Sequence, residues 1–134
     1  MQLAPYLFFN GNCEEALNQY AAIFNGKIVG LNRYGGSPVA EQAPPGYTDK
    51  VMHASFEADG VSFMASDGMP GPERGEGPIS LCLALKDVTE ATRVFNALAE
   101  GGKISMPLAK QFWGDTFGTL TDKYGIEWMV NCSS

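Results

Sequence analysis

The sequence predicts an α+β fold built from two copies of one βαβββ module. Two helix-like segments are each followed by the tripeptide Gly-Lys-Ile, at 26–28 and at 102–104. Two hairpin-like segments, 58–66 and 123–131, also resemble each other and come in the same order. An internal repeat determines the architecture of a whole chain. Because both pairs of similar segments occur in the same order in the two halves, duplication explains them better than chance does.

Both helices are predicted from their boundary residues and from the spacing of apolar side chains. Asn12 is a good N-cap residue with Glu15 three positions later, and Asn25-Gly26 ends the first helix. The second helix repeats this plan 75 or 76 positions later, from an Asp87 cap to Gly101-Gly102. The apolar stripes have helical spacing: Ala16, Leu17, Tyr20, Ile23 and Phe24, then Val88, Ala91, Val94, Phe95 and Leu98.

Apolar runs with alternation predict four strands in each module. They are Leu3–Phe9, Lys27–Tyr34, Lys50–Ala58 and Val61–Asp67, then Ile79–Leu85, Lys103–Leu108, Asp115–Thr121 and Ile126–Cys132. Asp59-Gly60 has the composition of a two-residue hairpin turn, and Tyr124-Gly125 lies at the second hairpin. The two hairpins match at a spacing of 65, which pairs Phe63 with Trp128 and Met64 with Met129.

Glycine and proline mark the connections between these elements. Residues 35–49 form an insertion loop in the first module, and residues 68–78 form a linker. We expect one domain over 1–134, with module one at 1–67 and module two at 79–134. Long loops in compact domains tend to be functional or mobile. We therefore expect the 35–49 loop to be less ordered than its neighbours and to act as a lid or an interface arm.

Composition excludes several classes of protein. Nine Lys and Arg against fifteen Asp and Glu give a net charge of −6, which disfavours binding to nucleic acid or to anionic membranes. The apolar runs are shorter than the ~20 residues of a membrane span, and no signal peptide is recognisable. Three cysteines without CxxC spacing are typical of reduced thiols. We expect a cytoplasmic protein.

Alternation along the strands predicts a ligand-binding cleft. Small residues such as Ser80 and Cys82 should face away from the helix, and Met64 and Met129 should do the same. Two such sheets would curl around a shared cleft, where Trp113 would add a wall for an apolar or aromatic small molecule. Alternatively, these side chains fill a core or an interface. Five aromatic residues are predicted to be core: Phe8, Tyr20, Phe24, Phe95 and Trp128.

Several motifs along the chain resemble one known family. They are Tyr6–Gly11 with Ala16 and Tyr20, Val51–Ala54, Phe112-Trp113-Gly114 with Gly118, Asp122 with Tyr124-Gly125, and Trp128–Asn131. Together they resemble the vicinal oxygen chelate superfamily of glyoxalases, bleomycin-resistance proteins and extradiol dioxygenases. The particular resemblance is to its PhnB-like branch, which carries a 3-demethylubiquinone 3-methyltransferase domain name. It implies paired curved sheets and a homodimer.

The resemblance also implies where a metal site would lie. Metal-dependent members hold the ion with His or Glu at inward strand positions, which here fall near 5–7 and at Met64, Ser80 and Met129. None of these supplies an imidazole or a carboxylate, and a thioether is a poor ligand for Zn²⁺, Ni²⁺ or Fe²⁺. We therefore predict no standard metal site and no cofactor. The methyltransferase name is not adopted either, because Asn10-Gly11-Asn12 is not the glycine-rich turn of the usual S-adenosylmethionine enzymes.

Two residues are candidates for catalysis, each with a structural alternative. His53, the one histidine, is a candidate general base, with Asp67 as a possible orienting partner; alternatively it is a structural histidine. Cys13 lies in the first turn of a helix, where the dipole lowers a thiol pKa; alternatively it is an ordinary helix residue.

Three functions remain open. The first is a metal-free protein that binds or senses a small apolar or aromatic molecule. The second is an enzyme, a lyase or isomerase acting on a small oxygenated substrate through a non-standard site. The third is an interaction domain whose cleft is filled by side chains. The missing ligand pattern favours the first, whereas a tightly held stoichiometric metal would favour the second.

Overall fold

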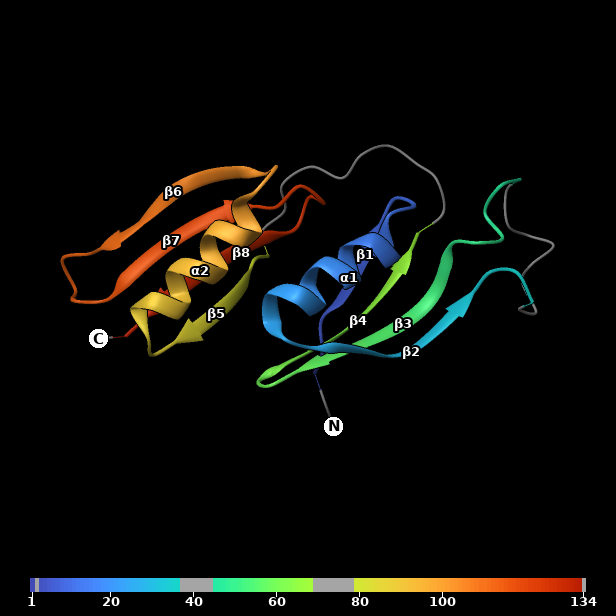
Figure 1. Cartoon of the computed structure of the whole chain (residues 1–134), viewed down its shortest axis with the longest axis horizontal. Helices are drawn as coiled ribbons and strands as arrows, with labels where there is room; N and C mark the ends of the chain where they lie inside the picture. The colour runs from blue at the N-terminus through green and yellow to red at the C-terminus, as the bar shows by residue number, and fades with distance from the viewer. Residues whose placement is uncertain (2, 37–44, 69–78, 134) are drawn as a thin grey trace. The chain divides into compact units, whose positions relative to one another are not determined.

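The computed structural model describes residues 1, 3–36, 45–68 and 79–133 and divides into two compact units, Met1–Glu73 and Arg74–Ser134 (Figure 1). The division falls within the predicted linker, of which residues 69–78 lie outside the described residues. Residues 37–44 of the predicted insertion loop also lie outside them. The assignment of both modules to one domain, and the order of that loop, stay predictions.

The first unit contains one helix and a four-stranded sheet. Its elements are β1 (Tyr6–Phe9), α1 (Cys13–Phe24), β2 (Lys27–Arg33), β3 (Val51–Ala58) and β4 (Val61–Asp67). The strand order is β1-β4-β3-β2, with β1 parallel to β4 and the other pairs antiparallel. A two-residue turn at 59–60 joins β3 to β4, and Gly60 has a φ of 76° there. The predicted hairpin is confirmed.

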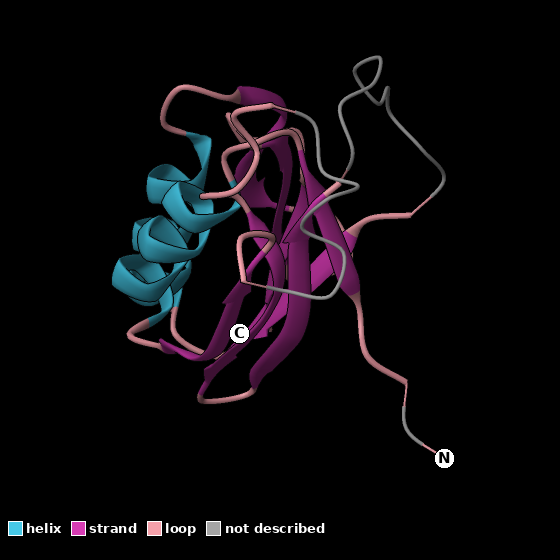
Figure 2. Cartoon of the chain, turned by 90° about the vertical axis from the view of Figure 1, so that its right-hand side faces the viewer, coloured by secondary structure: helices cyan, strands magenta, loops and turns pink. Residues whose placement is uncertain are grey.

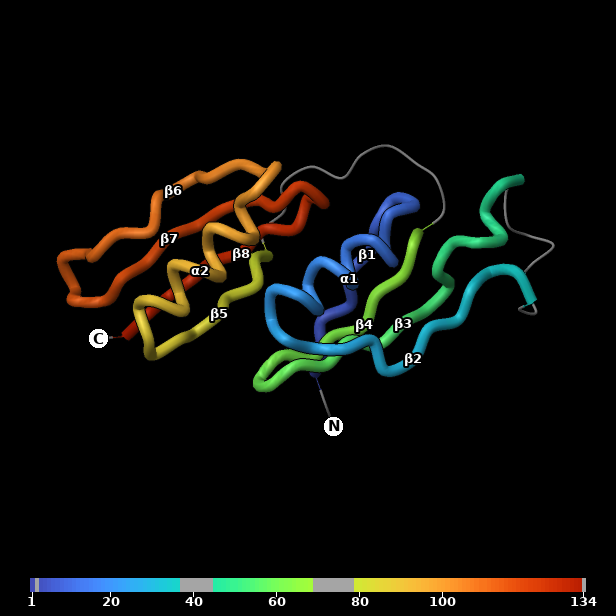
Figure 3. Tube along the Cα trace, in the orientation of Figure 1, coloured from blue at the N-terminus to red at the C-terminus, as the bar shows by residue number. Residues whose placement is uncertain are grey.

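The second unit repeats this plan element by element. It contains β5 (Leu81–Leu85), α2 (Val88–Ala99), β6 (Lys103–Lys110), β7 (Thr116–Thr121) and β8 (Glu127–Cys132). The strand order is β5-β8-β7-β6, again with a parallel first pair. The traces in Figure 3 follow the same course in both units. The predicted duplication and fold class are therefore confirmed.

Strand register extends the duplication to single residues. Met64 lies opposite Tyr6 in the first parallel pair, and Met129 lies opposite Cys82 in the second. The antiparallel neighbours agree, because Met64 also pairs with Ser55 and Met129 pairs with Thr119. Positions 64 and 129 are therefore equivalent, as their spacing of 65 in the sequence predicts.

Each helix lies on one face of its own sheet (Figure 2). In each unit the core side chains lie between that helix and that sheet. In the first unit Tyr20 of α1 packs edge-on against Phe63 at 6.1 Å, and Phe63 stacks on Phe56 at 4.9 Å. In the second unit Trp128 and Phe95 are buried. A Cβ on Gly118 would lie 2.8 Å from the Phe95 ring, so α2 approaches the sheet closely only because this residue is glycine. The predictions of core positions for Tyr20, Phe95 and Trp128 are confirmed.

Some details of the prediction are wrong. Phe8 is 48% exposed and is not in the core, because alternation in β1 directs Leu7 and Phe9 toward α1. Asn12 is the N-cap of α1 but makes no side-chain capping hydrogen bond, whereas Asp87 accepts one from the backbone N–H of Thr89. The predicted end of α1 at Asn25-Gly26 is confirmed, but the left-handed residue is Asn25, with a φ of 56°, and not the glycine.

Neither helix is a candidate membrane span. Both have 12 residues, too few to cross a bilayer, and no described helix combines the required length and apolar character.

Candidate functional site

The sheet of the first unit has a second face, opposite α1, on which aromatic and polar side chains gather. Register places Tyr6, Met64 and Ser55 in one row across β1, β4 and β3. Phe8 and His53 lie two residues along from Tyr6 and Ser55, and therefore on the same side of the sheet. We call these five residues the helix-free face of the first sheet. These side chains are partly exposed: His53 and Met64 are half-buried, and Phe8 is exposed.

A hydrogen bond joins two of these side chains. The Tyr6 hydroxyl lies 3.1 Å from Nδ1 of His53, and the two ring centroids are 5.7 Å apart. The Phe8 ring lies 4.9 Å from the Tyr6 ring. The result is a cluster of three rings, one of them an imidazole fixed by a hydrogen bond, next to the flexible Met64 thioether. This combination suits contact with a flat apolar molecule that carries a polar group.

The equivalent face of the second sheet carries different chemistry. Cys82 occupies the position of Tyr6, and Phe117 occupies that of His53, two residues before Thr119. Trp113, in the turn between β6 and β7, packs edge-on against Phe117 with 6.0 Å between centroids. Asn131 donates a hydrogen bond of 3.2 Å to Asp115 at the same end of the sheet. The second face is therefore aromatic at one end but lacks the tyrosine–histidine pair.

The predicted cleft residues lie in both units. Met64 lies on the helix-free face of the first sheet, and Cys82 and Met129 are neighbours on that of the second. Trp113 is 49% exposed in its turn. Ser80 is exposed and precedes β5, so the prediction that it lies within the strand Ile79–Leu85 is wrong. The formation of one shared cleft by these residues stays a prediction.

The structure adds Tyr6 and Phe8 to the candidate site, whereas the sequence analysis gave the inward positions of the first strand only as near 5–7 and assigned Phe8 to the core. The signal was present, because two core side chains at Leu7 and Phe9 require Tyr6 and Phe8 to face the other way. The contact with His53 was not visible in the sequence. It requires that β4 lie between β1 and β3 and that the parallel register bring Tyr6 opposite Met64.

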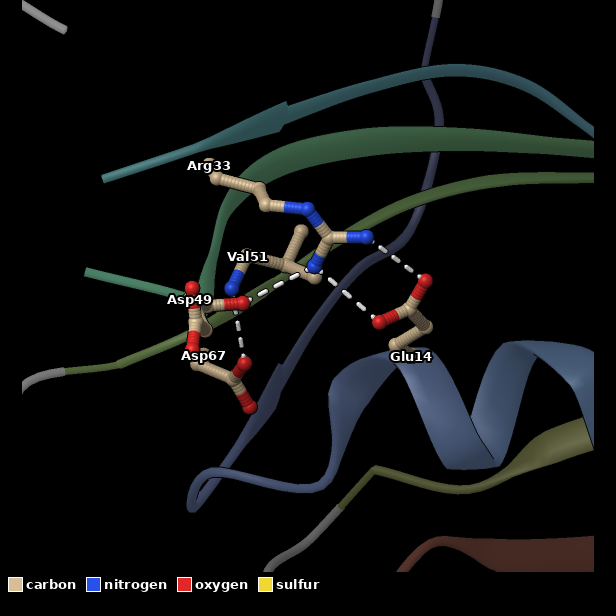
Figure 4. Close-up of polar contacts among 5 residues, drawn as sticks. All are labelled: Glu14, Arg33, Asp49, Val51 and Asp67. Carbon is tan, nitrogen blue, oxygen red and sulfur yellow. Dashed lines mark hydrogen bonds and ion pairs between the residues drawn. The ribbon is translucent and has the colours of Figure 1, made fainter. Parts of the chain in front are cut away.

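The sequence analysis offered Asp67 as an orienting partner of His53. In the structure Asp67 does not have this role. Its side chain lies on the helix side of β4, where one carboxylate oxygen accepts from the backbone N–H of Cys13 and the other from that of Val51, both at 2.9 Å. Figure 4 shows the second of these bonds. Asp67 is only 1% exposed. It therefore fastens the first turn of α1 and the start of β3 to the end of β4.

An ion pair reinforces the same region. The Arg33 guanidinium donates to both Glu14 carboxylate oxygens, at 3.0 and 2.8 Å, and to the carbonyl oxygen of Asp49 at 2.8 Å (Figure 4). The hydrogen bond from Arg33 lowers the pKa of the Glu14 carboxyl. These contacts join α1 to β2 and lie on the opposite side from the candidate site.

Cys13 has the properties of a structural thiol. It is fully buried, and burial, followed by the nearby charges of Asp67 and Glu14, raises its pKa to about 12. Desolvation and the acidic neighbours therefore outweigh the helix dipole, which alone would favour the thiolate. The nucleophile hypothesis for Cys13 is wrong, and the ordinary alternative is supported.

The donor atoms do not fit the metal site that the superfamily resemblance implies. Among the described residues, no group of three or more His, Cys, Asp and Glu side chains converges. On the helix-free face of the first sheet the single imidazole is already bonded to Tyr6. Of the inward positions named from the sequence, which were near 5–7 and at Met64, Ser80 and Met129, the two methionines carry thioethers. Three hard or borderline ligands for one ion are therefore not available there.

Comparison with known proteins identifies the family. The family described as 3-demethylubiquinone-9 3-methyltransferase matches residues 1–131. The chain belongs to this family. The crystal structure of protein PA1353 from Pseudomonas aeruginosa is 42% identical and covers 99% of this chain and 98% of its own, with a TM-score of 0.87. A putative 3-demethylubiquinone-9 3-methyltransferase, the PhnB protein from Bacillus cereus, is 32% identical and has a TM-score of 0.84. The match covers 99% of this chain and 100% of the Bacillus cereus chain.

The chain shares its fold with a glyoxalase-like domain. A glyoxylase/bleomycin resistance protein/dioxygenase domain from Frankia sp. EAN1pec has a TM-score of 0.69 at 13% identity, covering 100% of this chain and 93% of its own. The resemblance to the PhnB-like branch is thus confirmed. The described sheets each contain one parallel pair beside antiparallel pairs. This architecture differs from the doubly wound parallel sheet of common nucleotide-type cofactor folds, so the family name by itself assigns no methyl transfer.

Proposed function

We propose that the protein binds a small, planar and largely apolar molecule on the helix-free face of its first sheet. The observation that carries the proposal is the cluster of Phe8, Tyr6 and His53 next to Met64. The core of this unit already lies on the other face, between α1 and the sheet, so these rings are not needed to hold the helix. Rings of this kind bind flat ligands by stacking or edge-to-face contact.

Anthracene-2-sulfonate is a suitable probe because it is planar, fluorescent and soluble. We expect saturable binding, detected by fluorescence anisotropy, and a loss of about fivefold in affinity for Phe8→Ala, in line with one aromatic contact. Val88→Ala is the matched control, because Val88 is an equally exposed apolar residue at the start of α2. Trp113→Ala tests the aromatic end of the second sheet.

The outcomes separate the two faces. Weakened binding in Phe8→Ala with unchanged binding in Trp113→Ala supports the proposal and removes Trp113 from the site. Weakened binding in Trp113→Ala alone places the probe on the second unit and contradicts it. The absence of saturable binding to the unaltered protein also contradicts it.

An enzymatic role is the second candidate, favoured by the hydroxyl that fixes the His53 ring. An imidazole held in this way is a possible acid or base for a lyase or isomerase reaction. Metal analysis of protein purified without chelator distinguishes one form of this candidate. A stoichiometric, tightly bound transition metal would support metal-assisted catalysis and count against simple binding.

A further inference from the structure

We infer that His53 recognises its ligand through Nε2–H, so that the ligand carries a hydrogen-bond acceptor, such as a carbonyl oxygen, at the edge of its planar ring. Tyr6 is then a positioning residue that holds the imidazole in this state. The inference rests on the proposed function and deepens it by naming the chemical class of the ligand.

The first step concerns the tautomer of His53. A neutral imidazole has one N–H donor and one bare nitrogen acceptor, and a partner at one nitrogen decides which is which. The partner of Nδ1 is a phenol, whose O–H is a good donor and whose oxygen is a weak acceptor because its lone pair is delocalised into the ring. At 3.1 Å the favoured arrangement is Tyr6 O–H donating to bare Nδ1. The proton of His53 is thereby assigned to Nε2.

The second step concerns what Nε2–H faces. His53 is half-buried on the helix-free face, and no described residue makes a polar contact with Nε2. A polar group in a partly apolar surface gains most from a bound partner, because a ligand that covers it without accepting its hydrogen bond incurs a desolvation cost. Phe8 and Met64, which lie next to Tyr6 on this face, offer apolar contact only. A matching ligand therefore combines a flat apolar body with an oxygen acceptor.

The comparison between the two sheets supports the specificity of this arrangement. The second sheet has phenylalanine at the position equivalent to His53 and cysteine at that equivalent to Tyr6. The same backbone therefore presents an aromatic surface in both units but an imidazole N–H in the first unit only, because the chain has one histidine. This natural contrast also supplies the test variant His53→Phe, which keeps a ring and removes the donor.

The experiment uses two probes with the same charge and ring system. Anthraquinone-2-sulfonate carries two ring carbonyls, whereas anthracene-2-sulfonate carries none. We expect the unaltered protein to bind the quinone about fivefold more tightly, as one added hydrogen bond predicts. His53→Phe should bind both equally, and His53→Gln, which keeps an amide N–H, should regain part of the preference.

A spectroscopic measurement tests the positioning role of Tyr6 directly. Because the chain has one histidine, a ¹⁵N spectrum of the imidazole reports on His53 alone. We expect the Nε2–H tautomer in the free protein and a mixture of tautomers in Tyr6→Phe, with a reduced preference for the quinone. Cys82→Ala, at the equivalent position of the second unit, is the control and should leave the spectrum unchanged.

Three outcomes would overturn the inference. The first is an Nδ1–H tautomer in the free protein, and the second is a preference for the quinone that persists in His53→Phe. In the third, both probes bind with equal affinity to the unaltered protein, which rejects the acceptor while the proposed binding function stands. Failure of both probes to bind would reject the proposed function itself.

Discussion

The two units share a backbone plan but anchor their helices in different ways. In the first unit the N-terminus of α1 is held by Asp67, a residue from the far end of β4. In the second unit Asp87 caps α2 from the adjacent position, and the residue equivalent to Asp67 is the buried Cys132. The two copies of a duplicated fold can therefore keep the same strand register and still use residues at different positions to accept the backbone N–H groups at a helix N-terminus.

The second unit has its own buried carboxylate in another place. Asp122, at the turn between β7 and β8, accepts from the backbone N–H groups of Tyr124 and Ile126 and from Nε1 of Trp128 at 2.8 Å. The first unit forms the corresponding turn with only Asp59-Gly60, and Asp59 is exposed. Among the described residues each unit thus has one buried aspartate. Asp67 lies at the end of the last strand of the first unit, and Asp122 lies before the last strand of the second.

The largest expected difference is in the reactivity of the cysteine thiols toward an alkylating reagent. Cys82 is exposed, whereas Cys13 and Cys132 are buried. With a pKa of about 12, Cys13 exists as thiolate at about one part in ten thousand at pH 8. Mass spectrometry after brief iodoacetamide treatment of native protein should show one modified cysteine, Cys82. Modification of Cys13 at a comparable rate would contradict its burial in the first unit.

Asp67→Ala should produce the largest loss of stability. It leaves two buried backbone N–H groups without acceptors, and we expect the free energy of unfolding to fall by about 3–4 kcal/mol. Urea denaturation followed by circular dichroism measures this fall. The matched variant Cys132→Ala removes the equivalent side chain of the second unit, which accepts no such bonds, and should cost about 1 kcal/mol. Equal losses would mean that the carboxylate of Asp67 adds nothing beyond its volume.

Asp122→Ala should cost less, about 2–3 kcal/mol, because water can replace some of the turn contacts but the buried Trp128 N–H loses its acceptor. The same denaturation experiment applies, with Trp128 fluorescence as a local probe. Asp59→Ala, in the corresponding turn of the first unit, should change stability by no more than about 0.5 kcal/mol. A large effect at Asp59 would remove the contrast between the turns.

The smallest effect should be at the helix caps. Asp87→Ala should lower the free energy of unfolding by about 1 kcal/mol, the usual value for a lost N-cap. Asn12→Ala should have almost no effect, because the Asn12 side chain makes no capping bond. Thermal unfolding of both variants under identical conditions compares them. Equal losses would show that Asn12 caps α1 in solution and that Asp67 does not replace it.

Local patterns predicted most of the fold. Alternation placed Met64 and Met129 on the correct faces, and the Asp59-Gly60 pair located the first hairpin. The errors occurred where distant residues decide the outcome. Nothing near Asn12 shows that Asp67 will satisfy the helix end, and no local signal sets Tyr6 beside His53. Both contacts depend on the order and register of strands, which cannot be derived from spacing along the chain.

The bond between Asp67 and the amide of Cys13 spans 54 residues, whereas the Asp87 cap spans two. Contacts between distant residues carry the larger loop-closure cost and tend to form late, whereas local ones can form early. The first turn of α1 should thus be completed only after β4 has joined the sheet, while α2 can begin without waiting for distant strands. Substitutions at Asp67 should then accelerate unfolding and leave the folding rate nearly unchanged.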